Sequence, residues 1–175
     1  MTVKNTLTAL LFILACFTVH ARHVSDTLYA KDYGLMPWSF NNQTENFQKV
    51  ISFCKSKQAK VLVLESGRYD IWPEGAVRKE VFITNTSTEQ ECPSKVKTFG
   101  VLFEDMDGLT VEGNGSTLMF HGKQTMISFM HCKNMMLRNL HIDFERPGGS
   151  ELTISKVDEN GVEVAFHRDS RYVIN

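Results

Sequence analysis

The sequence lacks an excess of either charge. Lysine and arginine number 19 against 20 aspartates and glutamates, so the formal net charge is −1 at pH 7. Nucleic acids and anionic membrane surfaces attract strongly basic proteins, so neither is an expected partner. No pattern indicates an oligomeric state. The chain of 175 residues is 42% hydrophobic and 22% charged, an ordinary globular composition that is sufficient for one domain with a core.

The sequence also lacks an apolar run long enough for a comfortable membrane span. Its longest run, Leu7 to Val19, follows Lys4 and ends in Val19-His20-Ala21. This is the layout of a secretory signal peptide over residues 1–21. An alternative is a bacterial lipoprotein site at Ile13–Cys16, with Cys16 lipidated. In both cases the mature chain is exported. It is then periplasmic, secreted, or held at the outer membrane through Cys16.

No CxxC pair is present, which excludes a zinc ribbon and a thioredoxin-type redox motif. Cleavage after Ala21 would leave Cys54, Cys92 and Cys132. A disulfide between two of them stays open for an exported protein. Cys54 and Cys132 lie at apolar positions, where free buried thiols are common.

An amphipathic helix is predicted over residues 45–54, before a series of strands. Its apolar positions recur at i, i+3, i+4 and i+7: Phe47, Val50, Ile51 and Cys54. Asn42, three residues before Glu45, resembles a capping arrangement. Residues 60–72 then indicate a strand, a glycine turn and a second strand, and residues 85–95 a polar loop.

An internal repeat follows. "VLFEDMDGLTVEG" (101–113) aligns with "ISFMHCKNMMLRN" (127–139) at a shift of 26 residues. Five aligned pairs are apolar or sulfur-bearing in both copies, and the sixth, Gly113 with Asn139, consists of turn formers. Asn114-Gly115 is interpreted as a turn between strands. Short strands repeating at this period are typical of a β-solenoid.

The predicted fold is therefore all-β, the start of a parallel β-helix over residues 22–149. Each turn of such a coil buries its apolar row against the next turn, and the helix at 45–54 would cap the open end and its first unpaired strand edge. Two copies are fewer than a stable solenoid needs, so the fold is expected to be incomplete and the chain the front part of a longer protein.

The pattern changes after Pro147-Gly148-Gly149. Apolar and polar residues alternate around Leu152 and Ile154, and again around Val162 and Val164. Between these two stretches lies Asn160-Gly161, a dipeptide that strongly indicates a hairpin turn. Because antiparallel pairing does not belong in a parallel coil, residues 150–175 are predicted to begin a second, antiparallel β element.

A family resemblance supports this organisation. "DYGLMPWSF", "NFQKVISFCK" and "VLVLESGRYDIWP" are similar to the N-terminal cap of pectate-lyase-like β-helix proteins. "VLFEDMDGLTVEGNGSTLMFHGK", "HCKNMMLRNLHIDFERP" and "SELTISKV" resemble the N-terminal region of glycoside hydrolase family 110, the exported bacterial α-1,3-galactosidases. The resemblance covers about residues 30–174, and "FHGK…NLHIDFERP…SEL" is its most specific part.

The resemblance implies a right-handed parallel β-helix interrupted by small β-barrel insertions, the first of which would start at Ser150. It implies removal of terminal α-1,3-linked galactose, as in blood group B or linear α-galactosyl glycans, with inversion and without a metal or other cofactor. The family's catalytic aspartates lie in later coils, so no residue here is assigned a catalytic role.

"NLHIDFERPGG" (139–149) presents His141, Asp143 and Glu145 on one face of a strand. Carboxylates two residues apart emerge roughly 7 Å apart, within the ~6.5–9.5 Å separation used by inverting glycosidases. The favoured interpretation is a solvated strand face near a sugar cleft. A substrate-contact role for Asp143 and Glu145 is the alternative, with Arg146 binding a hydroxyl or pairing with Glu145.

His121, in "FHGK" at a strand end, is a further candidate substrate contact. His121, His131 and His141 recur every ten residues, but a turn of 26 residues would place them on different sides, so no metal site is expected.

Trp38, Trp72 and Tyr69 could stack on sugar rings, although packing under the N-terminal cap is the favoured interpretation.

Two other functions stay open. One is a pectin-directed lyase or hydrolase, against which the acidic strip at 141–145 counts, since a uronate site should be basic. The other is non-enzymatic: a β-helix binding or surface protein, or a truncated product without activity.

Overall fold

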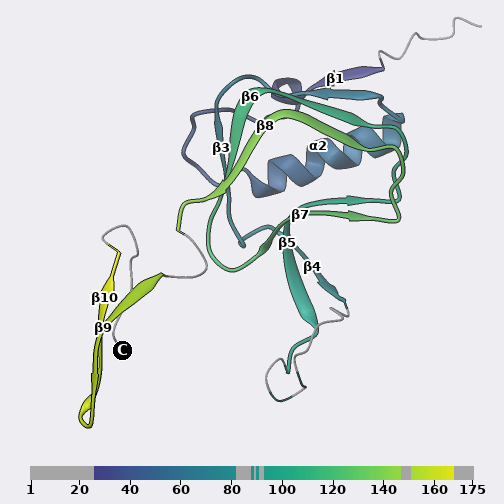
Figure 1. Ribbon diagram of the computed structural model, residues 1–175. Helices are drawn as coiled ribbons and strands as arrows, with labels where there is room; N and C mark the ends of the chain where they lie inside the picture. Colours follow the sequence, from purple (N-terminus) through teal and green to yellow (C-terminus); the bar gives the residue numbers. More distant parts are fainter. Residues whose placement is uncertain (1–25, 82–87, 89, 91–92, 147–150, 168–175) are drawn as a thin grey trace, which may run out of the picture.

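The chain folds mainly into β-strands (Figure 1), and this computed structural model describes residues 26–81, 88, 90, 93–146 and 151–167. The predicted signal peptide, Cys16 and Cys92 lie outside the described residues. No helix in the described ranges is long and apolar enough to cross a membrane. In chain order the elements are β1 (Thr27–Tyr29), η1 (Ala30–Tyr33), α2 (Thr44–Lys57), β2 (Val61–Val63), β3 (Arg68–Ile71), β4 (Val77–Glu80), β5 (Val96–Glu104), β6 (Thr110–Phe120), β7 (Thr125–Met130), β8 (Met136–Phe144), β9 (Leu152–Asp158) and β10 (Gly161–Phe166).

Two sheets lie on opposite sides of a shared core (Figure 1). In the first sheet, β2 and β3 pair in parallel with successive parts of one edge of β6, and β8 pairs in parallel with the opposite edge of β6. The strand β1 pairs in parallel with the outer edge of β2. In the second sheet, β7 pairs in parallel with β5, whereas β4 pairs with β5 in antiparallel orientation. The expectation that antiparallel pairing is confined to the region after residue 150 was therefore wrong for β4.

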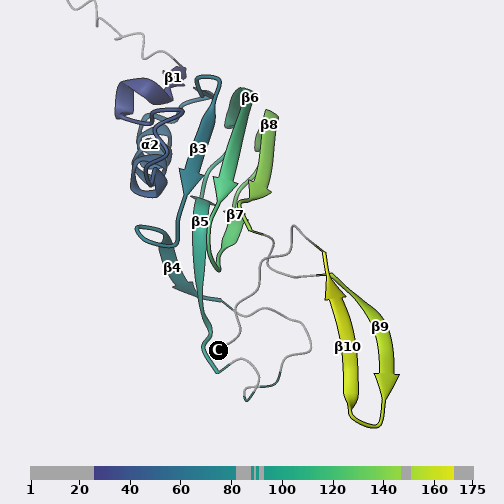
Figure 2. The same cartoon turned by 90° about the vertical axis from the view of Figure 1, so that its left-hand side faces the viewer.

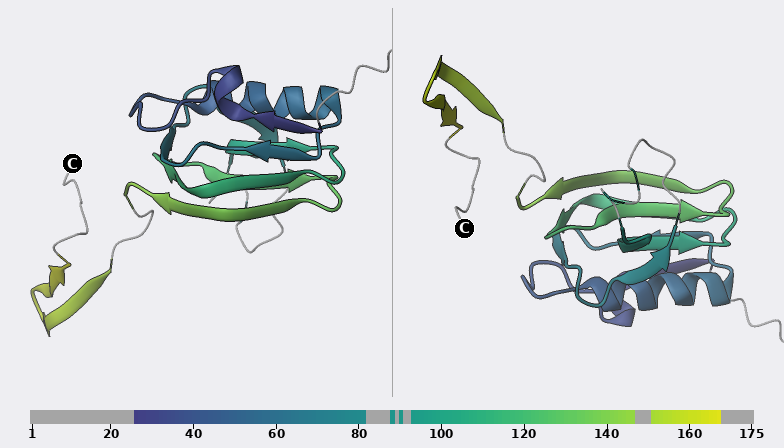
Figure 3. Two further views of the ribbon diagram at one scale, coloured as in Figure 1. Left: turned by 90° about the horizontal axis from the view of Figure 1, so that it is seen from above. Right: turned by 90° about the horizontal axis from the view of Figure 1, so that it is seen from below.

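Three layers of chain are stacked: the first layer holds β2 to β4, the second β5 and β6, and the third β7 and β8 (Figures 2 and 3). The predicted 26-residue repeat is confirmed as a register, since Val101 pairs with Ile127 and Val111 pairs with Leu137. Phe103 lies over Phe129, with ring centroids 5.2 Å apart and planes 9° from parallel. Like residues thus stack on like residues between layers.

The register changes inside β6. The shift is 26 residues at Glu112, which pairs with Arg138, but Ser116 pairs with Leu140, a shift of 24. Asn114 and Gly115 absorb the difference in left-handed conformations with φ of 51° and 75°. They form an irregularity within one continuous strand, so the prediction of a turn between two strands was wrong. Because this bend is tight, it needs residues that tolerate positive φ.

Gly113 lies at a close approach between the second and third layers. A β-carbon at this position would lie 2.4 Å from the carbonyl oxygen of Asn139 and 2.8 Å from Leu140 Cδ1. Gly113→Ala is therefore expected to lower the free energy of unfolding by about 2–3 kcal/mol, because the backbone of β8 must move away. Urea unfolding followed by circular dichroism measures this, with Gly115→Asn as the control, since Gly115 has open space and asparagine tolerates its φ. A Gly113→Ala protein as stable as the control would contradict the close packing.

The helix α2 covers the first-layer end of the stack (Figure 2), at the place predicted for the capping helix. Its buried apolar residues belong to the core: Phe47, Val50, Ile51 and Cys54. Burial raises the pKa of the Cys54 thiol to about 11, so it stays protonated. The outer edge of β2 is paired with β1, whereas Gln48 Nε2 of the helix donates to the Gly100 carbonyl of β5 at 3.0 Å.

Burial decreases from the helix end to the third layer. Leu62 and Phe120, in the first and second layers, are fully buried, whereas Leu140 and Phe144 are only partly buried and Ile142 is 42% exposed. Ile142 pairs with the buried Leu118 and so belongs to the inward row. Among the described residues, β8 has no strand on its outer side, and this leaves the apolar row half-covered.

The strands β9 and β10 form the predicted antiparallel hairpin, which lies apart from the stack in all views (Figures 1 to 3). The two-residue loop consists of Glu159 and Asn160, and Gly161 is already paired with Asp158. The turn therefore lies one residue earlier than Asn160-Gly161 indicates. The pairing register shifts between Glu163 and Val164. With this shift, three apolar residues of β9 pair with apolar residues of β10: Leu152 with Phe166, Ile154 with Val164, and Val157 with Val162.

Candidate functional site

The polar side chains of the first sheet gather where β3, β6 and β8 end. Parallel strands in register place equivalent residues side by side, and here Asp70, Met119 and Asp143 are successive partners across the three layers. One residue past the paired strands come His121 and Glu145, whose backbone amides donate to the carbonyls of Ile71 and Phe120, both at 2.9 Å. Three layers thus contribute to one cluster.

Asp70 is the centre of this cluster, and its side chain is only 4% exposed. Arg68 Nη2 donates to Asp70 Oδ1 at 2.6 Å, and Arg68 Nε lies 3.1 and 3.2 Å from the two carboxylate oxygens. His121 Nε2 lies 2.8 Å from Asp70 Oδ1. Arg68 Nη2 also donates to Glu145 Oε2 at 2.7 Å. One buried carboxylate therefore orients an arginine and a histidine, and the arginine in turn holds Glu145.

The charges of the cluster stabilise each other. Burial alone would raise the pKa of Asp70, but hydrogen bonds from Arg68 and His121 outweigh it and hold that pKa below its ordinary value. The hydrogen bond to Asp70 is also the main cause that raises the pKa of Arg68. Asp70 is therefore ionised at neutral pH, and it fixes Arg68 as a charged, oriented donor at the surface.

Aromatic side chains flank the cluster. The Trp72 ring lies flat on the His121 ring, with centroids 3.9 Å apart and planes 1° from parallel. On the other side, the Arg68 guanidinium carbon lies 5.6 Å from the centre of the Phe40 ring, and Phe40 is close to Trp38, at 6.3 Å between ring centroids. Trp38, Phe40 and Trp72 are 61%, 64% and 38% exposed. The prediction that the tryptophans pack under the cap was therefore wrong for both, whereas Tyr69 is buried as predicted.

The structure brings together two of the four predicted contact residues. His121 and Glu145 join the cluster through Asp70 and Arg68. Asp143 is exposed, and its Oδ1 accepts a hydrogen bond from the Phe144 amide at 2.8 Å. Arg146 is exposed beyond the end of β8, and the arginine that pairs with Glu145 is Arg68.

Comparison with characterised proteins identifies the relatives of this chain. It is 55% identical to α-1,3-galactosidase A of Bacteroides fragilis over 163 residues, which are 91% of this chain and 27% of that protein. It is 38% identical to an α-1,3-galactosidase B of Phocaeicola vulgatus over 155 residues (86% and 25%), and 35% identical to that of Bacteroides thetaiotaomicron over 135 residues (77% and 21%).

The chain belongs to the α-1,3-galactosidase family. It corresponds to the N-terminal part of these proteins and spans about a quarter of the length of the relatives it matches. No family model matches the chain. The galactosidase relationship extends over the helix, the stacked layers and the cluster around Asp70, because 91% of the chain is aligned.

Sequence reasoning missed Arg68 and Asp70, and for Trp72 it favoured packing under the cap over sugar stacking, although "GRYDIW" carries the signal. Arg68, Asp70 and Trp72 alternate with the buried Tyr69 and Ile71, as His141, Asp143 and Glu145 alternate with apolar residues. The alternation places both sets on the outward face. Their juxtaposition was not predictable without knowing that residues 68–71 pair with 117–120 and not with a neighbour in sequence.

The three regularly spaced histidines of the chain do not converge. His121 contacts Asp70, whereas His131 Nδ1 lies 3.3 Å from Asp105 at a layer corner, and His141 pairs with Thr117. Within the part of the chain that the structure describes, no group of three or more metal-ligating side chains is close enough to hold an ion.

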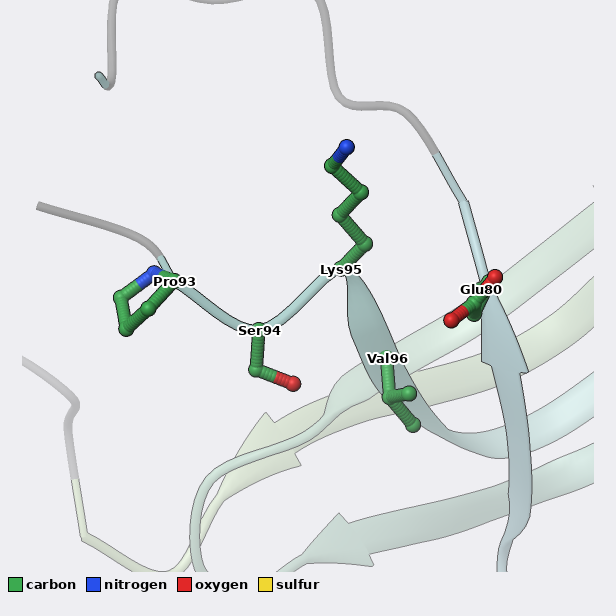
Figure 4. Close-up of a pocket in the computed structure, with 5 residues that line it drawn as sticks. All are labelled: Glu80, Pro93, Ser94, Lys95 and Val96. Carbon is green, nitrogen blue, oxygen red and sulfur yellow. The ribbon is translucent and has the colours of Figure 1, made fainter. Parts of the chain in front are cut away.

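A cavity of about 620 Å³ lies elsewhere, where β4 meets the start of β5 (Figure 4). Glu80, Pro93, Ser94, Lys95 and Val96 line it. None of the predicted contact residues takes part, so the cluster around Asp70, and not this cavity, is the candidate site.

Proposed function

We propose that the whole protein is an exo-acting α-1,3-galactosidase that removes terminal α-1,3-linked galactose from branched blood group B or linear glycans, with inversion. The observation that carries this is the 55% identity to α-1,3-galactosidase A over 91% of this chain. In an inverting reaction, one carboxylic acid protonates the glycosidic oxygen while a carboxylate activates water on the opposite face of the sugar. We place both groups in the part of the protein that follows Asn175.

In this proposal the chain supplies the cap and first coils of a right-handed parallel β-helix and one wall of the glycan site. The parallel pairing of β6 with β8 and of β5 with β7 supports the coil. Glu145, held by Arg68, supplies a hydrogen-bonding group on the outward face, and the exposed Asp143 and Arg146 extend it. His121 is buried against Asp70 and supports this face from within. The hairpin β9–β10 would begin the inserted β-barrel.

We also propose that the protein is exported. The layout of residues 1–21 supports cleavage and release to the periplasm or medium, and Cys16 supports the lipoprotein alternative. Mass spectrometry of the mature N-terminus separates the two routes, because lipidation leaves a diacylated Cys16 as the first residue.

The activity can be tested with a chimera in which this chain replaces the matched segment of Bacteroides fragilis α-1,3-galactosidase A. The substrate is galactose-α-1,3-galactose, and product formation is followed by proton NMR, which also reports the anomer released. We expect the chimera to release galactose first as the β-anomer and residues 22–175 alone to release none. Galactose release by residues 22–175 alone would instead place catalytic carboxylates in this chain, with Asp143 and Glu145 the first to replace.

A further inference from the structure

We propose that Trp72, Arg68 and Phe40 form a carbohydrate-binding subsite that takes one pyranose ring of the glycan. The ring would stack on the free face of Trp72 and hydrogen-bond with the Arg68–Glu145 pair. The inference rests on the proposed function for the class of ligand, and on the described residues for the site itself.

The first support is the orientation of Trp72. One face of its ring is covered by His121 at 3.9 Å between centroids, yet the residue is 38% exposed. The exposed part is therefore the opposite face and the edges. Burying an aromatic ring is favourable, so a tryptophan that is fixed and half open to solvent at a polar cluster is typical of a binding surface.

The second support is that Trp72 is fixed before any ligand arrives. Its backbone amide donates to Thr44 Oγ1 at 2.8 Å, and its carbonyl accepts from the same hydroxyl at 2.9 Å. Its ring is stacked on His121, which is itself held by Asp70. Binding to such a surface loses little conformational entropy.

The third support is the chemistry of the cluster to which the ring is linked through His121 and Asp70. Arg68 is a donor with a side chain 23% exposed, and Glu145 is an acceptor with a side chain 46% exposed; their polar atoms lie 2.7 Å apart. A neighbouring donor and acceptor match the vicinal hydroxyls of a sugar. The axial 4-hydroxyl of galactose leaves a continuous C–H surface on one face of its ring, which suits an aromatic plane. A uronate carries a carboxylate, which a basic site would bind. Here the carboxylate of Glu145 offsets the positive charge of Arg68, so the pair disfavours a uronate.

The Phe40 ring covers one face of the Arg68 guanidinium, and Trp38 lies next to Phe40. The guanidinium lies over the Phe40 ring, so its remaining directions are restricted toward Glu145 and solvent. Both tryptophans of the chain, Trp38 and Trp72, thus lie near this cluster, and intrinsic fluorescence reports on it.

The test uses galactose-α-1,3-galactose as the probe, titrated into the Trp38→Phe chain, in which Trp72 is the sole tryptophan and is excited selectively over the tyrosines. We expect saturable quenching of the Trp72 fluorescence.

Kinetics in the galactosidase chimera give the second measurement. Trp72→Ala should raise KM about fivefold to tenfold and leave kcat within about twofold of the unmodified chimera. Trp72→Phe should recover most of the loss in KM, because a smaller ring still stacks. Tyr29→Ala is the matched control, since Tyr29 is an exposed aromatic on β1, which pairs with β2 and not with β3.

The outcomes separate the two proposals. Saturable quenching without hydrolysis by the chimera would retain the subsite and reject the galactosidase activity. Hydrolysis with an unchanged KM in Trp72→Ala, or an equal rise in KM in Tyr29→Ala, would reject the subsite and retain the activity. An absence of quenching in a folded chain would also reject it. Failure of Trp72→Phe to recover binding would assign the loss in Trp72→Ala to folding, and so would overturn the stacking role.

Discussion

Asp70→Ala is expected to lower the free energy of unfolding by about 3 kcal/mol. Its carboxylate is 4% exposed and accepts hydrogen bonds from both Arg68 and His121, so alanine leaves a partly buried arginine and a buried histidine without their common partner. Removing one partner of a buried ion pair typically costs about 3–5 kcal/mol, and the lower end applies because Arg68 keeps Glu145. Urea unfolding of the purified chain measures the loss.

Asp143→Ala is the matched control, since it removes an aspartate two layers away on the same face, where the side chain is exposed. Its effect should stay within about 0.5 kcal/mol. If both replacements cost the same, Asp70 is not the centre of the cluster. Loss of the galactoside-induced Trp72 quenching in a folded Asp70→Ala chain would further show that Asp70 positions the subsite through His121.

The pH dependence of Asp70→Asn follows from the lowered pKa of Asp70. A carboxyl whose pKa is lower in the folded state stabilises the fold at pH values above its unfolded pKa, about 4, and this contribution is lost as pH falls through the folded pKa. The stability difference between the native chain and Asp70→Asn should therefore be constant near neutral pH and shrink below about pH 4. A difference that grows on acidification would contradict the ionised state of Asp70. Chemical unfolding of both proteins across this range measures it.

The stacked layers were largely predictable from the sequence because the repeat is a physical register. Val101 over Ile127 and Phe103 over Phe129 are the same residue pairs in the sequence alignment and in the paired strands. The helix was equally predictable, since its buried residues follow a 3.6-residue period. Sequence spacing is enough where each turn of chain copies the last.

The structure differs from the sequence-based predictions where neighbouring layers no longer share the same length and pairing. The bend at Asn114 and Gly115 adds two residues to one layer, so no single shift describes the whole of β6. The strand β4 pairs back on β5, which a model of repeated parallel turns does not contain. The hairpin turn moved by one residue because Gly161 entered the strand ladder.

The candidate site could be predicted only in part for a related reason. His121 and Glu145 were identified as strand-end polar residues, but their partners, Asp70 and Arg68, lie 51 and 77 positions earlier in the sequence. These partners belong to the first layer, whose sequence does not align with the repeat shared by the second and third layers. The exposure of Trp72 depends on its stacking against His121, a contact between two layers. Periodicity predicts which side of a strand a residue occupies, but it does not predict which strand lies next to it.

Phe47→Ala is expected to produce the largest loss, about 4 kcal/mol of the free energy of unfolding. Phe47 is 1% exposed in the core beneath α2, and deleting a buried phenylalanine side chain typically costs about 3–5 kcal/mol through lost transfer energy and the cavity left behind. Phe53→Ala is the matched control on the same helix. Phe53 is 43% exposed and packs on Tyr33 with 4.7 Å between ring centroids, so its loss should be about 1 kcal/mol. Equal losses in the two proteins, measured by urea unfolding, would show that α2 does not cap the core.

The same replacement tests whether the cap and the subsite are one unit. The helix begins at Thr44, whose hydroxyl fixes the backbone of Trp72, and the preceding Gln43 amide donates to the Asp70 carbonyl at 2.8 Å. Loosening the helix should therefore release both groups from their positions. We expect Phe47→Ala to weaken galactose-α-1,3-galactose quenching of Trp72, at a urea concentration where the chain is still folded, and Phe53→Ala to leave it unchanged. Unchanged quenching in Phe47→Ala would show that the stacking on His121 alone holds Trp72 in place.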